Sequence, residues 1–516
     1  MESPQQDHCE RAMEEESTSI LLNNTFSALN SQEAQQLQVK PIDTKWVYKT
    51  KQNPDGSTQY ISWLVMKGYE HTGFGETYTP VGKLTMVRYL ISLIGRYGWN
   101  MKHLDAVTAV LNPEINDNDI YMTLPARRPE GQNALKIIVR LRKALYGVAQ
   151  APRLWHDNIN AFLLSLELTQ SLADPNLYLL SDGILILLYV DDISMSYPEA
   201  AAKAAIEVKA KLSETYKIMN LGPSSEFLSI KIYRDSTRVS LSQKDYITMI
   251  FRLFDMEHTH SISTPMDSNV RLYLAQNQGE KELEDIIDDQ AVVGSLMYAA
   301  LATRPDIPYA VADLSHYNSR PFTSLMTAGK RVLQYLKWTA DFWLHFNSNG
   351  IGISIGIDIG NSLIGYSDSH WANDSADRKS RGGHVILASN GGAVSWQSWK
   401  QSLIAMSTLE AEFIACLEAS REAKWLLQLQ KDIHGKDLPP LPIDCDNQGA
   451  LTLITTWIIK AHTKHTNVCY RNSQDLHKRQ IAYYFYVHTD ENVADIFTKA
   501  LTKDRHMKFT KAMGVW

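Results

Sequence analysis

The sequence predicts an α+β protein built from several domains. With 516 residues, the chain exceeds the size that one hydrophobic core normally serves. Hydrophobic residues make up 44% and charged residues 21%, as in globular proteins, and short strand-like apolar runs alternate with segments of helical spacing. Because the formal net charge is −6, any binding of nucleic acid requires a locally basic surface.

The sequence also indicates the compartment. Its four scattered cysteines form no C-x-x-C pair, which argues against a zinc module or a disulfide framework and is typical of a reducing environment. The first residues lack the basic-then-apolar pattern of a signal peptide. No apolar run approaches the ~18 residues that cross a bilayer. We therefore expect an intracellular protein without a membrane partner.

The first forty residues, 1–40, predict a helical lead-in. Thr44 to Lys51 and Tyr60 to Lys67 predict the two strands of a hairpin, with Asn53-Pro-Asp-Gly56 as its turn. Lys45 and Lys49 alternate on one face of the first strand. This spacing suits a surface that faces phosphates, and it also suits a solvated strand face.

The next segments place a single acid between two predicted elements. Leu84 to Tyr97 carries apolar residues at helical spacing, which predicts a helix that faces a core. Asp105 follows in a short extended segment, where it is either a functional carboxylate or a residue that caps the next element. Ile120 to Pro125 predicts a strand, and a further helix ends at about Glu167.

An apolar run that ends in two adjacent acids lies at the centre of the first half of the chain. Five apolar residues from Ile184 lead through Tyr189 and Val190 to Asp191 and Asp192, and a second apolar-leaning segment follows. This pattern predicts a buried hairpin with the acids at its tip. The acids are either ordinary turn residues or ligands of a divalent cation such as Mg²⁺, which prefers carboxylate oxygens.

The second half of the chain is expected to begin with helices and to end with another set of acids. Residues 275–345 predict mostly helices, one of which carries Lys330 and Arg331 on a face that contacts either nucleic acid or solvent. Four acids then follow a strand, helix, strand and helix order: Asp368, Glu410, Asp446 and Asp495. This order is similar to that of ribonuclease H, and the similarity implies a second metal site. As alternatives, Glu410 closes a capping box with Ser407, and Asp446 caps a helix. The nearby Glu412, Asp444 and Asp490 are assigned to surface or supporting roles.

Several short motifs occur in a fixed order. They are Lys45-Trp-Val47, Glu76-Thr-Tyr-Thr-Pro-Val81, Leu145-Tyr-Gly147, Gln150-Ala-Pro-Arg153 with Trp155, Tyr189-Val-Asp-Asp192, Leu241-Ser-Gln-Lys-Asp-Tyr246, Gly294-Ser-Leu-Met-Tyr298 and Thr303-Arg-Pro-Asp306. This series resembles the reverse transcriptase of copia-type long-terminal-repeat retrotransposons, from about His8 to the last residues. The resemblance implies a right-hand fingers and palm domain over 41–260, a helical thumb or connection over 261–350, and a mixed-sheet α/β ribonuclease H-like domain over 351–516.

The resemblance also implies an activity with its metals and partners. The expected enzyme is an RNA-directed DNA polymerase that uses an RNA template, a DNA primer and deoxynucleoside triphosphates, linked to a ribonuclease H that cleaves the RNA of an RNA–DNA hybrid. Two Mg²⁺ ions are expected in each site, held in the polymerase by Asp105, Asp191 and Asp192, and in the nuclease by Asp368, Glu410, Asp446 and Asp495. Gln150, Tyr189 and Lys67 are expected to bind the nucleotide, while Lys45, Lys49, Lys330 and Arg331 contact nucleic acid. The expected location is a cytoplasmic virus-like particle, the nucleus or both, and the oligomeric state stays open.

Some residues depart from the family pattern. Ile61 and Trp63 stand where the family has Lys and Arg, which would neutralise nucleotide phosphates. Val110 replaces an aromatic residue that excludes a ribose 2′-hydroxyl, and Asn467 and Arg471 replace an acid and a histidine. We therefore expect weak polymerisation and weak sugar discrimination. A catalytically impaired relic or a co-opted nucleic-acid-binding protein is the second interpretation, and an unrelated metal-dependent nuclease is the third.

Overall fold

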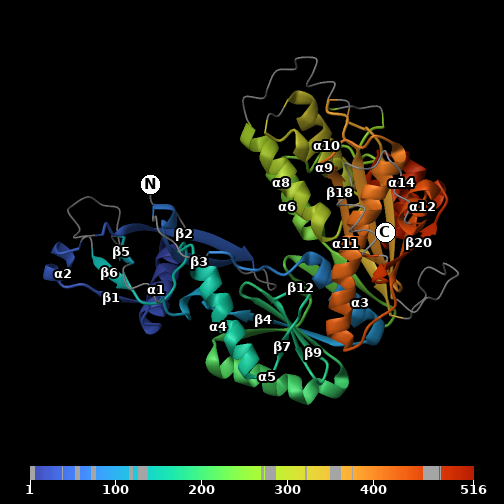
Figure 1. The fold of residues 1–516 in the computed structure, drawn as a ribbon. Helices are drawn as coiled ribbons and strands as arrows, with labels where there is room; N and C mark the ends of the chain where they lie inside the picture. The colour runs from blue at the N-terminus through green and yellow to red at the C-terminus, as the bar shows by residue number, and fades with distance from the viewer. Residues whose placement is uncertain are drawn as a thin grey trace.

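The computed structural model describes residues 6–37, 39–52, 58–70, 77–115, 120–125, 137–268, 272, 286–319, 322–348, 362–374, 376–456, 476 and 478–516. The expected turn at Asn53-Pro-Asp-Gly56, together with Glu76, Asn467 and Arg471, lies outside these ranges. Figure 1 shows an elongated molecule whose blue N-terminal part lies at one end and whose orange and red C-terminal part lies at the other. No helix in the described ranges has both the length and the apolar character that crossing a membrane requires.

The N-terminal part is a five-stranded sheet with a helix on one face. Its elements are α1 (Gln6–Leu22), β1 (Phe26–Ala28), α2 (Ser31–Gln35), β2 (Ile42–Gln52), β3 (Thr58–Met66), η1 (Gly68–Glu70), β5 (Tyr121–Thr123) and β6 (Ile138–Leu141), with strand order β1-β6-β5-β2-β3. The predicted hairpin is β2 and β3, and α1 packs on β3. The sequence did not predict β1, which pairs with β6 and joins the lead-in to this sheet.

The central part is a six-stranded sheet that is covered by helices on both faces. Its elements are α3 (Leu84–Tyr97), β4 (Asn100–Ala106), η2 (Ala109–Leu111), α4 (Ala151–Ser165), β7 (Thr169–Gln170), β8 (Leu177–Leu180), β9 (Ile184–Tyr189), β10 (Asp192–Tyr197), η3 (Glu199–Ala201), α5 (Ala202–Thr215) and β11 (Ile218–Pro223). The strand order is β11-β4-β10-β9-β8-β7. Ile184 and Ile186 pack with α4 and α5, whereas Leu185 and Leu187 pack with α3. Because both faces are covered, β9 is apolar throughout.

The connecting part combines a small sheet with a helical core. Its elements are β12 (Glu226–Phe227), β13 (Ile230–Arg234), β14 (Arg238–Ser242), α6 (Lys244–Leu253), α8 (Ile286–Ala302), α9 (Pro308–His316), α10 (Thr323–Trp338) and β15 (Leu344–Asn347). The strands form a sheet in the order β12-β13-β14-β15, and the helices share one apolar cluster. Figure 1 shows these helices beside the C-terminal part. The predicted helical region is thus confirmed for the residues that the structure describes.

The C-terminal part is the mixed sheet that the sequence predicted. Its elements are β16 (Leu363–His370), β17 (Arg381–Ala388), β18 (Gly391–Lys400), α11 (Thr408–His434), β19 (Leu441–Cys445), α12 (Gln448–Thr456), β20 (Ala482–Tyr486), η5 (Thr489–Glu491), η6 (Val493–Phe497) and α14 (Lys503–Ala512). The strand order is β18-β17-β16-β19-β20, in which β16 to β18 are antiparallel and β16, β19 and β20 are parallel.

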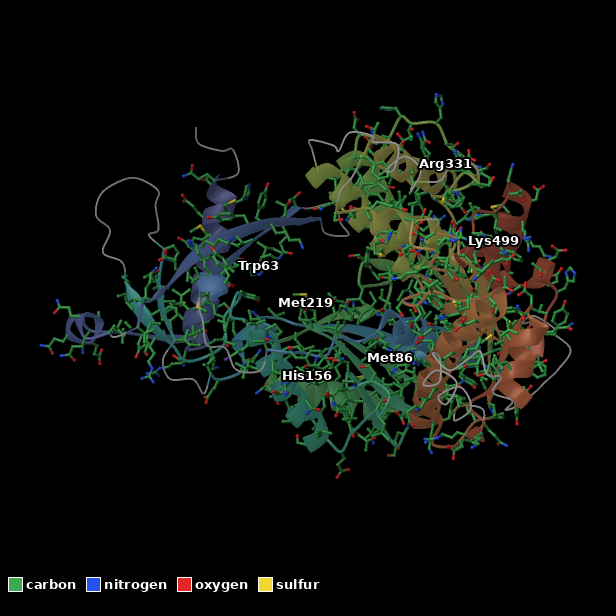
Figure 2. All side chains as sticks on the ribbon, turned by 45° about the horizontal axis from the view of Figure 1, so that its top comes forward. Trp63, Met86, His156, Met219, Arg331 and Lys499 are labelled. Atoms are coloured by element: carbon green, nitrogen blue, oxygen red, sulfur yellow. The ribbon has the colours of Figure 1, made fainter. Side chains whose placement is uncertain are left out.

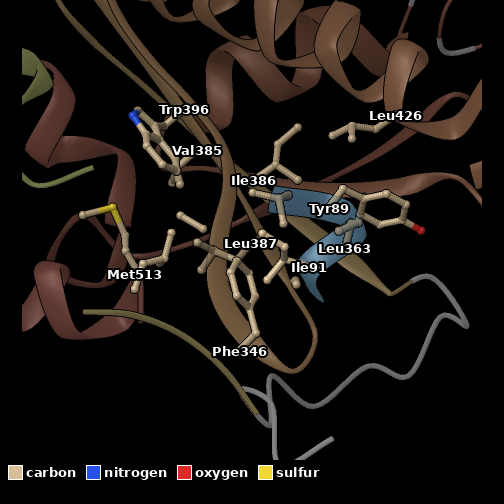
Figure 3. Packing of buried hydrophobic residues seen from close by; sticks show 14 of the residues in the cluster. Tyr89, Ile91, Phe346, Leu363, Val385, Ile386, Leu387, Trp396, Leu426 and Met513 are labelled. Carbon is tan, nitrogen blue, oxygen red and sulfur yellow. The ribbon is translucent and has the colours of Figure 1, made fainter. Parts of the chain in front are cut away.

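Helix α3 of the central part is also buried against the C-terminal sheet. Figure 3 shows Tyr89 and Ile91 of α3 beside Leu363 and Leu387 of that sheet, within one apolar cluster. The buried Arg88 joins the same interface: its Nε donates to the carbonyl oxygen of Val394 at 2.8 Å. The predicted helix is therefore covered by two domains, which explains why it is apolar over most of its surface.

Candidate active sites

The tip of the β9–β10 hairpin is fixed by a helix behind it. Val190 occupies the turn with φ of 61°, a left-handed conformation that is unfavourable for a β-branched residue. The indole Nε1 of the buried Trp155, on α4, donates to the carbonyl oxygen of Val190 at 2.7 Å. This bond stabilises the turn that carries Asp191 and Asp192.

The strand register brings Asp105 to this hairpin. β4 pairs with β10 so that Asp105 is the direct partner of Asp192, and side chains of directly paired residues share one face of a sheet. The amide of Ala106 also donates to the carbonyl oxygen of Asp191 at 2.9 Å. Burial, followed by the carboxylates of Glu16, Asp191 and Asp105, raises the pKa of the nearby Tyr146. The three predicted acids therefore lie at the same end of the palm sheet, although their carboxylate oxygens are not among the groups within 4.8 Å found in the described residues.

A histidine that the prediction did not include lies among these acids. The Nε2 of His103 is 2.6 Å from Oδ1 of Asp192. His103 lies two residues before Asp105 on β4, so the period of two places both side chains on one face. That spacing was the signal in the sequence that could have identified it. The remaining oxygens are the hard carboxylate ligands that a divalent cation prefers, so the residues present fit a metal site.

The surface of β2 and β3 that is expected to face the nucleotide lacks two of the family's cations but keeps two lysines. Burial alternates along β3 so that Ser62, Leu64 and Met66 face α1, and Ile61 and Trp63 face the other way. Lys49 is the direct cross-strand partner of Ile61, and Lys45 lies on the same face of β2. The ring of Trp63 lies 6.2 Å from that of Tyr146. The exposed Lys49 on β2 is thus a cation directly opposite Ile61, the position on β3 where the family has a lysine.

The other predicted nucleotide-binding residues lie around this surface. Gln150 directly precedes α4, and Tyr189 ends β9 as the partner of Asp192. Lys67 follows β3, and the next residue, Gly68, packs so closely on Gly147 that a Cβ at Gly68 would lie 2.0 Å from the Gly147 carbonyl oxygen. This contact joins the hairpin of the fingers to the loop before α4. Val110 is half-buried and packs against the core of the fingers.

The two predicted cations of α10 differ in their surroundings. Lys330 is exposed. Arg331 instead donates to Oγ1 of Thr264 at 3.0 Å and lies 3.9 Å from Oδ2 of Asp267. Their contact with nucleic acid stays a prediction, and Arg331 already has partners within the protein.

The C-terminal sheet brings together three of the four acids predicted for the second site. The carboxylate oxygens of Asp368, Asp446 and Asp495 lie within 4.8 Å of one another. They come from β16, from the residue after β19 and from η6. η6 approaches β17 so closely that a Cβ at Gly383 would lie 2.6 Å from Cβ of Phe497. The sequence predicted this convergence from the order of the elements.

The fourth acid requires a correction. Glu410 accepts a hydrogen bond from the amide of Met406 at 2.7 Å, and its own amide donates to Oγ of Ser407, so its carboxylate closes the start of α11. Glu412 takes its place: its Oε1 accepts from the amide of Ser369 at 3.2 Å, and its carboxylate lies with Cys445 and Asp446 in a second group within 4.8 Å. The capping alternative therefore describes Glu410, and the prediction assigned the wrong member of the pair to the cluster.

Burial of the carboxylates in this site and the repulsion between them favour the binding of positively charged groups. Burial, followed by the nearby Asp368, raises the pKa of Glu412 well above its usual value and that of Asp495 to about 7. Lys499 Nζ lies 2.7 Å from Oδ1 of Asp495 and 3.8 Å from Oδ2 of Asp368, and Arg505 also pairs with Asp495. Divalent cations would offset the remaining charge, so this cluster also fits a metal site.

The two sites lie in different parts of the molecule. In Figure 2, Met219 marks the first site, because it is the strand partner of Asp105, and Lys499 marks the second. Trp63 lies in the N-terminal part of the same view. Among the described residues, both groups of potential ligands within 4.8 Å belong to the C-terminal site. At the palm site, Asp192 is hydrogen-bonded to His103.

Comparisons with known proteins cover nearly the whole chain. Residues 27–268 match the family model described as reverse transcriptase (RNA-dependent DNA polymerase). The retrovirus-related Pol polyprotein from transposon TNT 1-94 of Nicotiana tabacum is 31% identical over 99% of this chain and 38% of its own length. That from transposon RE1 of Arabidopsis thaliana is 30% identical over 92% of this chain and 32% of its length, so the chain spans about a third of these relatives.

A shorter relative and a solved structure complete the comparison. The transposon Ty5-1 protein of Saccharomyces cerevisiae is 31% identical over 62% of this chain and 100% of its own length. The foamy viral protease-reverse transcriptase, solved in complex with double-stranded DNA, covers 93% of this chain and 70% of its own, with a TM-score of 0.51 and 12% identity. At that identity the likeness concerns the fold.

Proposed function

Because the chain belongs to the reverse transcriptase family of Pol polyproteins from copia-type retrotransposons, we propose that it copies RNA into DNA and degrades the RNA of the resulting hybrid. The observation that carries this proposal is the pairing of β4 with β10, which sets Asp105 opposite Asp192 at the tip of the hairpin. Its partners would be an RNA template, a DNA primer, an RNA–DNA hybrid and deoxynucleoside triphosphates.

In the polymerase site, Asp105, Asp191 and Asp192 would hold Mg²⁺. When bound, two such ions activate the attacking 3′-hydroxyl and stabilise the departing pyrophosphate. Lys67 and Lys49 would lie along the phosphates, and Gln150 and Tyr189 would border the bound nucleotide. The hydrogen bond from Trp155 to the hairpin turn supports this role, because it holds the two turn acids in one conformation. 

In the nuclease site, Asp368, Glu412, Asp446 and Asp495 would hold the metal. Mg²⁺ there would lower the pKa of a bound water and stabilise charge on the RNA phosphate. Lys499 partly neutralises the acids before any cation arrives. Glu410 would contribute only to the start of α11.

A catalytically impaired polymerase is the second candidate, and the fingers favour it. Ile61 and Trp63 cannot form the bidentate contacts with phosphate that Arg makes. Lys49 lies on the same face and would offset part of that loss. Val110 would leave room for a ribose 2′-hydroxyl. We also propose a cytoplasmic particle or the nucleus as the location, which fractionation of expressing cells would test.

The test is Mg²⁺-dependent extension of a DNA primer on an RNA template, with RNA cleavage in the hybrid scored in the same reaction. Asp191→Asn with Asp192→Asn should abolish extension alone, and Asp446→Asn should abolish cleavage alone. Primer extension that persists in the Asp191→Asn, Asp192→Asn variant would contradict the proposed polymerase activity. Intact cleavage without extension in the parent protein would favour the impaired polymerase, and loss of both in a folded protein that binds the hybrid would favour a binding protein.

A further inference from the structure

His103 is held in place from two sides. Its ring packs edge-to-face on the buried Phe227, with centroids 5.3 Å apart and planes at 77°. Its side chain is 12% exposed, and on the other side its Nε2 meets Oδ1 of Asp192 at 2.6 Å. Because an ionised carboxylate can only accept, Nε2–H is the donor in this bond.

The strand register explains why Asp192 needs this donor. Asp192 is paired with Asp105, and His103 is paired with Ser194, so the imidazole lies diagonally across from Asp192 on the same face. A carboxylate beside Asp105 is repelled by it when no cation is present. The hydrogen bond gives Asp192 one ordered position and uses only Oδ1, which leaves Oδ2 for another ligand.

We propose that His103 is a positioning residue that orients Asp192 for divalent-metal binding in the palm. This inference rests on the proposed function for the identity of the site. Hydrogen bonds from a neighbouring side chain order a carboxylate before the metal arrives, and their removal typically weakens metal binding about 10- to 100-fold. His103 acts through Asp192 and does not itself touch the reacting atoms.

The experiment is a titration of the full-length chain with Mn²⁺, followed by electron paramagnetic resonance of the free ion. Every variant, including the parent, also carries Asp368→Asn and Asp446→Asn, which remove metal binding in the C-terminal site. The Mn²⁺ binding that Asp191→Asn then abolishes is the binding in the palm. His103→Leu removes the donor. His103→Gln keeps an amide N–H at a similar reach, whereas the shorter His103→Asn does not. The half-saturating Mg²⁺ concentration for primer extension is measured in parallel, without the two nuclease substitutions.

The matched control is His156 on α4. Its side chain is 11% exposed, close to that of His103, and its Nδ1 lies 3.7 Å from a carboxylate oxygen of Asp157, away from the palm acids. Figure 2 shows its place. His156→Leu should leave Mn²⁺ binding unchanged, which separates the role of His103 from a general effect of losing a buried histidine.

We expect His103→Leu and His103→Asn to weaken Mn²⁺ binding in the palm about tenfold, with His103→Gln within about twofold of the parent. The Mg²⁺ requirement for extension should rise in the same order, while the rate at saturating Mg²⁺ changes less. Unchanged or tighter Mn²⁺ binding in His103→Leu, or in His103→Asn if the first variant does not fold, would overturn the proposal, as would the absence of palm binding in the parent. If the parent binds Mn²⁺ as expected but extends no primer, the proposed function fails and the role of His103 stands.

Discussion

The indole Nε1 of Trp155 donates a 2.7 Å hydrogen bond to the carbonyl oxygen of Val190. Val190 has a left-handed backbone, and two of the three palm acids, Asp191 and Asp192, follow it directly. One buried side chain on α4 therefore holds the turn that carries two of the three palm acids.

Trp155→Phe should keep the aromatic packing and lose the hydrogen bond. We expect a loss of roughly 1–3 kcal/mol in the free energy of unfolding, because a polar group of the turn loses its partner. Primer extension should fall about tenfold or more, while RNA cleavage in the C-terminal domain is retained. Denaturant unfolding and the two activity assays check this. Equal losses of both activities would mean that the substitution damages the whole fold instead of the turn.

Glu412→Gln and Glu410→Gln form a matched pair on one helix. Glu412→Gln should reduce hybrid cleavage at least a hundredfold, because it removes a carboxylate from the cluster with Asp446. Glu410→Gln should weaken only the start of α11, by about 1 kcal/mol. Cleavage rates and thermal unfolding of both variants decide between them. The opposite pattern would restore Glu410 as the catalytic acid.

Ile61→Lys combined with Trp63→Arg should raise the efficiency of primer extension about tenfold, since it returns cations to the face of β3 opposite α1. Lys49→Ala in the natural sequence should lower that efficiency several-fold, because Lys49 lies across the ladder from Ile61. Both effects should appear mainly in the KM for the nucleotide. No effect of Lys49→Ala would show that the cation across the ladder does not replace the missing one.

Glu16 should make the stability of the N-terminal part depend on pH. Burial between α1 and β3 raises the pKa of Glu16 to about 7, from 4.5. Between these two pKa values the folded protein keeps a proton on Glu16 that the unfolded chain releases. The contribution of Glu16 to the free energy of unfolding is therefore most favourable below about pH 4.5 and is lost as the pH rises through about 7. Ionised Glu16 costs at most about 3 kcal/mol above that range.

Glu16→Gln should therefore stabilise the protein at about pH 8 and remove this part of the pH dependence. Denaturant unfolding at about pH 5 and pH 8 measures the difference. Glu14→Gln, at an exposed position on the same helix, is the control. If Glu16→Gln is no more stable than the parent at pH 8, the raised pKa of Glu16 in the folded protein is contradicted.

Local patterns predicted much of the fold because they report burial directly. The helix from Leu84 to Tyr97 has the bounds that its apolar spacing predicted. The run that ends at Tyr189 is the buried strand that the sequence predicted, and its hairpin carries the acid pair. These elements depend on periodicity and on turn chemistry, which are properties of short segments.

Which of two neighbouring residues enters a site depends on packing between elements and not on the local pattern. Glu410 and Glu412 both lie in the first turns of α11, and each residue is rotated by about 100° from the one before it around a helix. Which of them faces the sheet is set by how α11 lies on β16, and the sequence of the helix alone does not contain that orientation. The short strand β1 also became a strand only because β6 offered it a partner.

The sequence by itself determined the family, the order of the domains' elements and all but one of the acids assigned to the two sites, because these depend on residue type and spacing. The tertiary structure decided which atoms meet. It paired Asp105 with Asp192 through the register of β4 and β10, placed His103 against that carboxylate, and exchanged Glu410 for Glu412. The physical reason is that these contacts join segments far apart in the chain, and only the packing of the sheets and helices fixes which faces they share.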